Sequence, residues 1–219
     1  MTWLEKGVPL TDVTTPTVVS GDLPQGLASA FQNSGRIAWD VETSGLDWRR
    51  DRLALCQIYS PHVGVAIVKI DQATSPRMAA LLSDPGVEKV FHHAPFDVRF
   101  MTHLWKIPAA AVRCTKVASK LVAPAALNSE HSLAALVDRH LGLRLEKGDV
   151  RTSDWEATKL SPEQLQYAVR DVLYLLPLLD ALEKQLADIG RRQLYDDCCQ
   201  FIPTRVQLEL LDSPDVFAY

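Results

Sequence analysis

The chain has 219 residues, of which 47% are hydrophobic and 23% are charged. This composition is ordinary for a globular protein and excludes a fibrous or disordered chain, and the length suffices for a sizeable core. The formal net charge of −4 at pH 7 excludes a protein that coats nucleic acid through an overall positive field. A polyanionic partner would therefore need a local basic patch, or cations bound at an acidic site.

The apolar runs and turn residues predict a mixed α/β architecture. In chain order we expect a short strand at 16–19, a helix at 23–35, strands within 37–47, 51–60 and 62–70, a helix at 75–86, a strand at 87–93, and helices at 95–105, 115–122, 131–142 and 161–190. The three consecutive strands should form an antiparallel meander, and a helical crossover should lead to the fourth. Without a repeat or an obvious linker, residues 1–219 are expected to form a single domain.

Cysteine content and the amino-terminal sequence indicate the cellular compartment in which the protein is expected. The four cysteines form no C-x-x-C pair and are too few for a disulfide scaffold, so reduced thiols in a cytoplasmic protein are expected. The start MTWLEKGVPL lacks the apolar core of a signal peptide. No apolar run reaches the roughly 18 residues of a membrane helix, so no membrane partner is expected.

The stretch IAWDVETSGLD, at 37–47, places two acids in an otherwise apolar strand. Because alternate side chains of a strand share a face, Asp40 and Glu42 should point together, away from Trp39 and Val41. Two neighbouring carboxylates repel each other, and burial raises the cost of both charges. A bound cation would relieve this repulsion; a solvated strand end or a basic partner for each acid are the alternatives.

Two further segments carry acids at the start or on one face of a helix. Asp97 lies in the first turn of the helix after the fourth long strand, where an acid often only complements the helix dipole. Ser161 and Gln164 predict a capping box at the start of a late helix. On that helix Tyr167 and Asp171 are four residues apart and share a face, and a simple Tyr–Asp hydrogen bond at the surface is the alternative to a functional role.

Considered together, these segments supply four carboxylates and one phenol from separate elements. Hard oxygen ligands of this kind suit Mg²⁺ or Mn²⁺. Two such ions about 3.5 to 4 Å apart can hold the attacking and leaving oxygens of a phosphodiester. Asp40 and Glu42 are then predicted to be metal ligands.

The motifs WDVETSGLD, HHAPFDVRF and YAVRD resemble, in order and spacing, the three exonuclease motifs of the DEDD superfamily, with Tyr167 marking the DEDDy branch. The stretches RCTKVASKLV, HSLAALVDRHLGLRLEKG and TSDWEATKLSPEQLQYAVRDVLYLLPLLDALE are similar to bacterial ribonuclease D. The resemblance covers about residues 35–190, and 191–219 look like the C-terminal helical extension of short ribonuclease D-like proteins. We expect the catalytic domain only, without the HRDC domains of ribonuclease D.

This resemblance implies a ribonuclease H-like mixed sheet, an antiparallel meander plus parallel strands, flanked by helices. It also implies hydrolysis of single-stranded RNA from the 3′ end to nucleoside 5′-monophosphates, with two divalent metal ions, Mg²⁺ or Mn²⁺. By the same resemblance Asp40 would bridge both ions, and Glu42 and Asp171 would hold the ion on the nucleophile side. Asp97 would support the second ion, and Tyr167 would orient the attacking water.

Candidate substrate contacts lie close to these motifs. They are Thr43, Ser44, Gly45 and Leu46 in the turn after Glu42, His93 and Phe96 beside Asp97, and Lys147, Arg151 and Trp155 before the late helix. Packing is the alternative role for Leu46, Phe96 and Trp155, and a strand-end histidine such as His93 commonly packs or binds backbone.

The expected partner is single-stranded nucleic acid, and we expect RNA in preference to DNA. Metal ligands contact phosphate, whereas discrimination between RNA and DNA needs contacts to the 2′-hydroxyl, so the motifs leave a 3′-5′ exonuclease on single-stranded DNA as the enzyme alternative. A catalytically silent RNA-binding module is an alternative of a different class.

Overall fold

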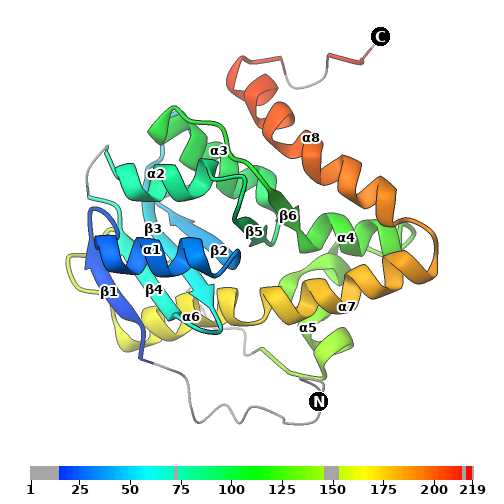
Figure 1. Ribbon diagram of the computed structural model, residues 1–219, viewed down its shortest axis with the longest axis horizontal. Helices are drawn as coiled ribbons and strands as arrows, with labels where there is room; N and C mark the ends of the chain where they lie inside the picture. Colours follow the sequence, from blue (N-terminus) through cyan, green and yellow to red (C-terminus); the bar gives the residue numbers. More distant parts are fainter. Residues whose placement is uncertain (1–14, 72–73, 146–152, 214–215, 219) are drawn as a thin grey trace.

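The computed structural model describes residues 15–71, 74–145, 153–213 and 216–218 (Figure 1). Within these ranges six strands form one sheet, in the order β1-β4-β3-β2-β5-β6. The strands are β1 (Thr17–Ser20), β2 (Arg36–Thr43), β3 (Leu53–Ser60), β4 (Gly64–Lys69), β5 (Glu88–Phe91) and β6 (Val112–Cys114). The helices are α1 (Gln25–Asn33), α2 (Pro76–Ser83), α3 (Ala94–Trp105), α4 (Thr115–Val122), the 3₁₀ helix η3 (Asn128–His131), α5 (Leu133–Leu141), α6 (Pro162–Leu173), α7 (Leu175–Asp188) and α8 (Arg192–Leu210).

The strand pairing confirms the expected mixed sheet. Strands β2, β3 and β4 form an antiparallel meander. Through the crossover that contains α2, β5 lies parallel to β2, and β6 lies parallel to β5. At the far edge β1 lies parallel to β4. The carboxyl ends of β2, β5 and β6 therefore lie at the same edge of the sheet.

Two elements differ from the prediction. Strand β6 was not predicted, because three residues are too few to show an alternating pattern. The segment 161–190 was expected as one helix but forms α6 and α7, which meet at Tyr174. Pro177 lies in the first turn of α7; a continuous helix would need an N–H at that position, and proline has none.

Alternation along β2 assigns its two faces to different helices. Trp39 lies on the apolar face, where its ring centroid is 6.2 Å from that of Phe91 and 6.3 Å from that of Trp105 in α3. Helix α6 packs against β2, β3 and β4. Helix α8 lies beside α3 and β6, at the end of the sheet remote from β1 (Figure 1). Among the described residues, no helix is both long and apolar enough to cross a membrane.

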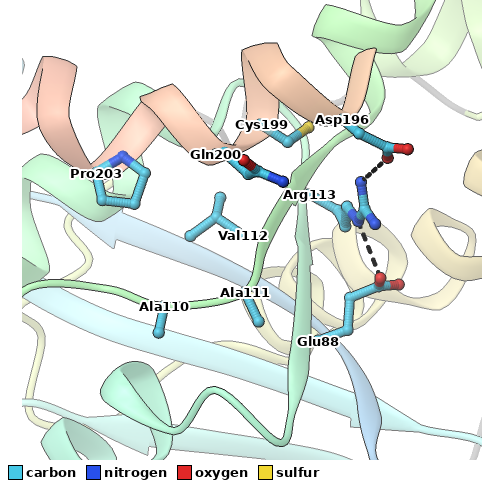
Figure 2. A pocket seen from close by; sticks show the side chains of 9 residues that line it. All are labelled: Glu88, Ala110, Ala111, Val112, Arg113, Asp196, Cys199, Gln200 and Pro203. Carbon is cyan, nitrogen blue, oxygen red and sulfur yellow. Dashed lines mark hydrogen bonds and ion pairs between the residues drawn. The ribbon is translucent and has the colours of Figure 1, made fainter. Parts of the chain in front are cut away.

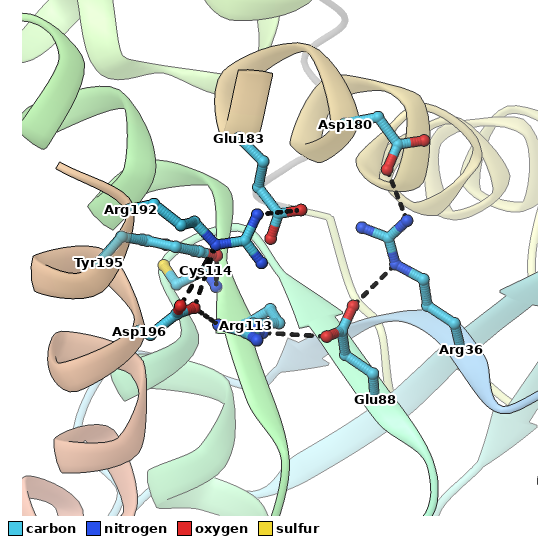
Figure 3. A network of polar contacts seen from close by, with 9 residues as sticks. All are labelled: Arg36, Glu88, Arg113, Cys114, Asp180, Glu183, Arg192, Tyr195 and Asp196. Atoms are coloured by element: carbon cyan, nitrogen blue, oxygen red, sulfur yellow. Dashed lines mark hydrogen bonds and ion pairs between the residues drawn. The ribbon is translucent and has the colours of Figure 1, made fainter. Parts of the chain in front are cut away.

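Ion pairs join the starts of the parallel strands to the last two helices (Figure 3). Glu88, at the start of β5, accepts from Arg36 at 2.8 Å and from Arg113 at 2.9 Å. The remaining pairs of this network are Arg36–Asp180, Arg113–Asp196, Arg192–Asp196 and Arg192–Glu183. The network therefore ties β2, β5 and β6 to α7 and α8 at the edge where these strands begin.

Candidate active site

Carboxylates from β2 and α6 meet beside the carboxyl end of β2. One ligand oxygen from each of Asp40, Glu42 and Asp171 lies within 4.8 Å of the others. Glu42 is buried, whereas Asp40 and Asp171 are partly exposed, so the cluster is open to solvent. The expectation that Asp40 and Glu42 share a face is confirmed. A register irregularity between Glu42 and Thr43 ends the regular pairing with β3 directly after the second acid.

Asp97, in the first turn of α3, lies beside these three carboxylates but is not in the group whose ligand oxygens lie within 4.8 Å of one another. The helix begins after His93, whose left-handed backbone (φ 73°) turns the chain out of β5. The Asp97 side chain is only 3% exposed and accepts a hydrogen bond from the backbone N–H of Val41, between the two acids of β2. This contact holds the fourth carboxylate against the β2 backbone. An acid that only complemented the helix dipole would not need such a contact.

Tyr167 lies one turn before Asp171 on α6, and its hydroxyl donates to the Asp171 carboxylate. The predicted capping box begins this helix: the Ser161 N–H donates to Gln164 at 2.8 Å, and the Gln164 N–H donates to the Ser161 hydroxyl at 3.2 Å. Burial, followed by the charge of Asp171, raises the pKa of Tyr167. The phenol is therefore a hydrogen-bond donor at neutral pH.

The electrostatics of the cluster are those of crowded, desolvated acids. Burial and then the charges of Asp97, Asp171 and Glu42 raise the pKa of Asp40 well above its usual range, and burial raises the pKa of Asp97 in the same way. Burial raises the pKa of Asp171 to about 7. Within the described ranges, no lysine or arginine forms an ion pair with Asp40 or Asp97. Closely spaced oxygen ligands fit a divalent cation, which would offset their repulsion.

The turn after Glu42 is held by its own hydrogen bonds. The Thr43 hydroxyl donates to the Gly45 carbonyl at 2.5 Å, and Ser44 exchanges backbone and side-chain hydrogen bonds with Arg52, each 2.9 Å long. The Ser44 amide, which could have met a ribose, is therefore occupied. Leu46 is 80% exposed, so the packing alternative for Leu46 is wrong.

The other candidate contacts are distributed unevenly around the acids. His93 is exposed, and Phe96 is partly buried, with its ring centroid 5.0 Å from that of Phe100. Trp155 is only 2% exposed, and its ring centroid lies 5.8 Å from that of Tyr167, which favours the structural alternative for this residue. Lys147 and Arg151 lie outside the described residues.

Gln57, on β3, was not among the predicted site residues. It is fully buried, lies directly opposite Asp40 in the β2–β3 pairing, and its Nε2 is 3.5 Å from Glu42 Oε1. A signal was available, because Gln57 is a polar residue in the otherwise apolar run LALCQIYS. The antiparallel meander, once predicted, would have placed β3 beside the acids of β2.

A separate cavity of about 360 Å³ lies between β6 and α8 (Figure 2). Its lining consists of Glu88, Ala110, Ala111, Val112, Arg113, Asp196, Cys199, Gln200 and Pro203. None of the four carboxylates or Tyr167 contributes to this lining, and Arg113 is occupied by Glu88 and Asp196. The acid cluster, not this cavity, is the candidate active site.

A mixed sheet with Asp-x-Glu on its central strand and helix-borne acids beside it defines a ribonuclease H-like nuclease. The profile of a family described as 3′-5′ exonuclease matches residues 17–187. The chain belongs to this 3′-5′ exonuclease family.

Known relatives agree in sequence and in fold. Ribonuclease D of Haemophilus influenzae is 32% identical over 189 residues, which are 85% of this chain and 46% of the relative. The chain thus spans about half the length of the curated relatives it matches. The structure of Brucella melitensis NrnC bound to pGG is 33% identical, with a TM-score of 0.84, and the match covers 94% of this chain and 98% of that one. The structure of the same protein with bound Mg²⁺ has the same TM-score and identity, and covers 94% and 99%.

Proposed function

We propose that the protein is a 3′-5′ exoribonuclease that shortens single-stranded RNA from its 3′ end and releases nucleoside 5′-monophosphates. The observation that carries this proposal is the meeting of Asp40, Glu42 and Asp171 within 4.8 Å. Asp97 is fixed beside them through Val41. Membership of the 3′-5′ exonuclease family and the likeness to a structure that holds pGG support the same substrate class. Residues 1–219 would act as one exonuclease domain.

Asp40, Glu42, Asp97 and Asp171 would hold two divalent cations, Mg²⁺ or Mn²⁺. When bound, such ions neutralise phosphate charge and make water a nucleophile near neutral pH. The charges of Asp97, Asp171 and Glu42 all act on Asp40, which supports Asp40 as the ligand that two ions would share. A family neighbour of known structure holds Mg²⁺.

Tyr167 would orient the attacking water. Its raised pKa keeps the hydroxyl protonated at neutral pH, so it can position an oxygen but cannot abstract a proton. Trp155 packs against its ring and holds the phenol at the margin of the cluster. The side chain that carries the hydroxyl is therefore fixed by packing from one side and by Asp171 from the other.

Leu46 offers the terminal base an apolar surface in the turn that follows Glu42. Thr43, Ser44 and Gly45 would hold that turn beside the 3′-terminal ribose, and Phe96 and His93 would contact the strand from the start of α3. Contacts of this kind tolerate any base, because they involve the flat face of the base and not its hydrogen-bonding edge.

The experiment is a time course on 5′-labelled single-stranded RNA and DNA of the same sequence, and on pGG, with Mn²⁺, with Mg²⁺ and with EDTA. We expect a ladder that shortens from the 3′ end of the RNA in either metal and is absent in EDTA and in Asp40→Ala. Asp180→Ala removes an exposed acid that pairs with Arg36 away from the cluster and should leave the ladder unchanged.

Two outcomes would contradict the proposal. Shortening of the DNA alone would establish a deoxyribonuclease that uses the same site. Binding of RNA without any shortening, unchanged by EDTA, would establish a binding module.

A further inference from the structure

Gln57 is a fully buried polar side chain at the base of the acid cluster. It lies opposite Asp40 in the β2–β3 pairing, so its side chain is on the face that carries both acids of β2. Glu42 is its diagonal neighbour across the two strands, a separation that two long side chains can span. The structure has them in contact, with Gln57 Nε2 3.5 Å from Glu42 Oε1.

The orientation of the Gln57 amide follows from charge. Rotating the amide by 180° would bring its oxygen against the Glu42 carboxylate, whereas the present orientation presents an N–H donor. This orientation leaves Gln57 Oε1 buried without a hydrogen-bond partner among the described residues. A buried amide with one unsatisfied atom is unfavourable for folding, so packing alone gives no reason for a glutamine at this position.

We propose that Gln57 is a positioning residue: its carboxamide holds Glu42 by one carboxylate oxygen and thereby directs the other oxygen toward Asp40 and Asp171. This inference rests on the proposed function, in which Glu42 is a cation ligand. Groups that hydrogen-bond to metal ligands fix the rotamer of those ligands, and their removal typically costs about 10- to 100-fold in metal affinity or activity. Gln57 is fully buried, so it would act through Glu42 and not by touching the substrate.

The test variant is Gln57→Met, which keeps the length and the approximate volume of the side chain and removes both polar atoms. We expect Mn²⁺ affinity, measured by calorimetry, to fall about 10- to 100-fold. The thermal midpoint without metal should be unchanged or higher, because the unsatisfied oxygen is gone. A side chain with a merely structural role would show the opposite pattern, with lower stability and unchanged affinity.

A double-mutant cycle with Glu42→Gln tests whether Gln57 acts through Glu42. In the Glu42→Gln background, Gln57→Met should change Mn²⁺ affinity less than threefold, because the carboxylate that Gln57 orients is absent. Gln185→Met is the matched control. Gln185, on α7, donates to His140 of α5 at 3.0 Å, and removing its amide should not change Mn²⁺ binding.

Equal Mn²⁺ affinity in Gln57→Met and the wild type would overturn the proposal, and so would full additivity in the cycle. If Gln57→Met does not fold, Gln57→Leu provides a second apolar replacement for the same measurements. Calorimetry with Mn²⁺ needs no substrate, so this test separates a failure of the positioning role from a failure of the exoribonuclease assignment.

Discussion

Replacing Asp171 by asparagine should make the metal-free protein more stable at neutral and alkaline pH. Burial raises the pKa of Asp171 from 3.8 to about 7. The native state therefore keeps a proton that the unfolded chain has already released, and stability must fall as the pH rises from about 4 through 7. Asparagine has no such proton, and its oxygen can still accept from the Tyr167 hydroxyl.

The size of the effect follows from the shifted pKa. Between pH 5 and pH 8, ionisation of Asp171 lowers the free energy of unfolding by up to about 3 kcal/mol. For a chain of this length, that corresponds to a fall in Tm of about 6–12 °C. Removing the charge also makes Asp40 and Asp97 less costly to ionise, which acts in the same direction.

The assay is thermal unfolding in EDTA from pH 5 to pH 8, for the wild type and for Asp171→Asn. His92, whose pKa desolvation lowers to about 3, raises stability with pH up to about 6.5, but this contribution cancels in the difference between the two proteins. With excess Mg²⁺ the wild-type curve should flatten, because the cation offsets the repulsion that the pH rise creates. Equal pH dependence of the two proteins in EDTA would refute the reasoning, as would a variant that is less stable at every pH.

Three further substitutions test separate parts of the site. Tyr167→Phe should lower kcat about 10²-fold, because the attacking water is no longer positioned, while Mn²⁺ affinity measured by calorimetry stays near the wild-type value; a loss of metal as complete as in Asp40→Ala would disprove the orienting role. Leu46→Ala should raise KM for RNA, by loss of about 1–2 kcal/mol of apolar contact with the terminal base, with Tm unchanged because the side chain is 80% exposed; an unchanged KM would remove Leu46 from the substrate path. Gly45→Ala should cost about 1 kcal/mol in urea unfolding, because a Cβ there overlaps the Asp51 carboxylate that accepts the Asp47 N–H at 2.7 Å. Gly26→Ala, where a Cβ meets nothing within 4 Å, is its control and should be neutral or stabilising.

Local periodicity was enough to predict how the acids of β2 are arranged. Alternation alone places Asp40 and Glu42 on one face, and the structure has them there. Helical spacing likewise predicted that Tyr167 and Asp171 share a face, and side-chain chemistry predicted the capping box that begins α6. These features depend on residues within one turn or one strand, where the sequence determines the geometry directly.

Features that depend on partners distant in the sequence were not predictable in the same way. Gln57 approaches Glu42 only because of the β2–β3 register, which a single strand pattern does not specify. The burial of Trp155 depends on its contact with the Tyr167 ring, and β6 is a strand only because β5 offers it an edge. In each case the decisive interaction joins segments whose relative placement is set by the whole fold.

The parallel strands β2, β5 and β6 carry different charges at the side of the sheet where they begin and at the side where they end. Arg36 and Arg113 lie at the edge where β2 and β6 begin and are held there by Glu88 (Figure 3). Asp40 is four residues further along β2 than Arg36, a distance of about 13 Å along an extended strand. These arginines therefore cannot neutralise the acids at the other end of β2 without breaking the ion pairs that join β2, β5 and β6. A divalent cation from solution would supply positive charge that Arg36 and Arg113 do not, so activity and stability at neutral pH are both expected to depend on divalent cations.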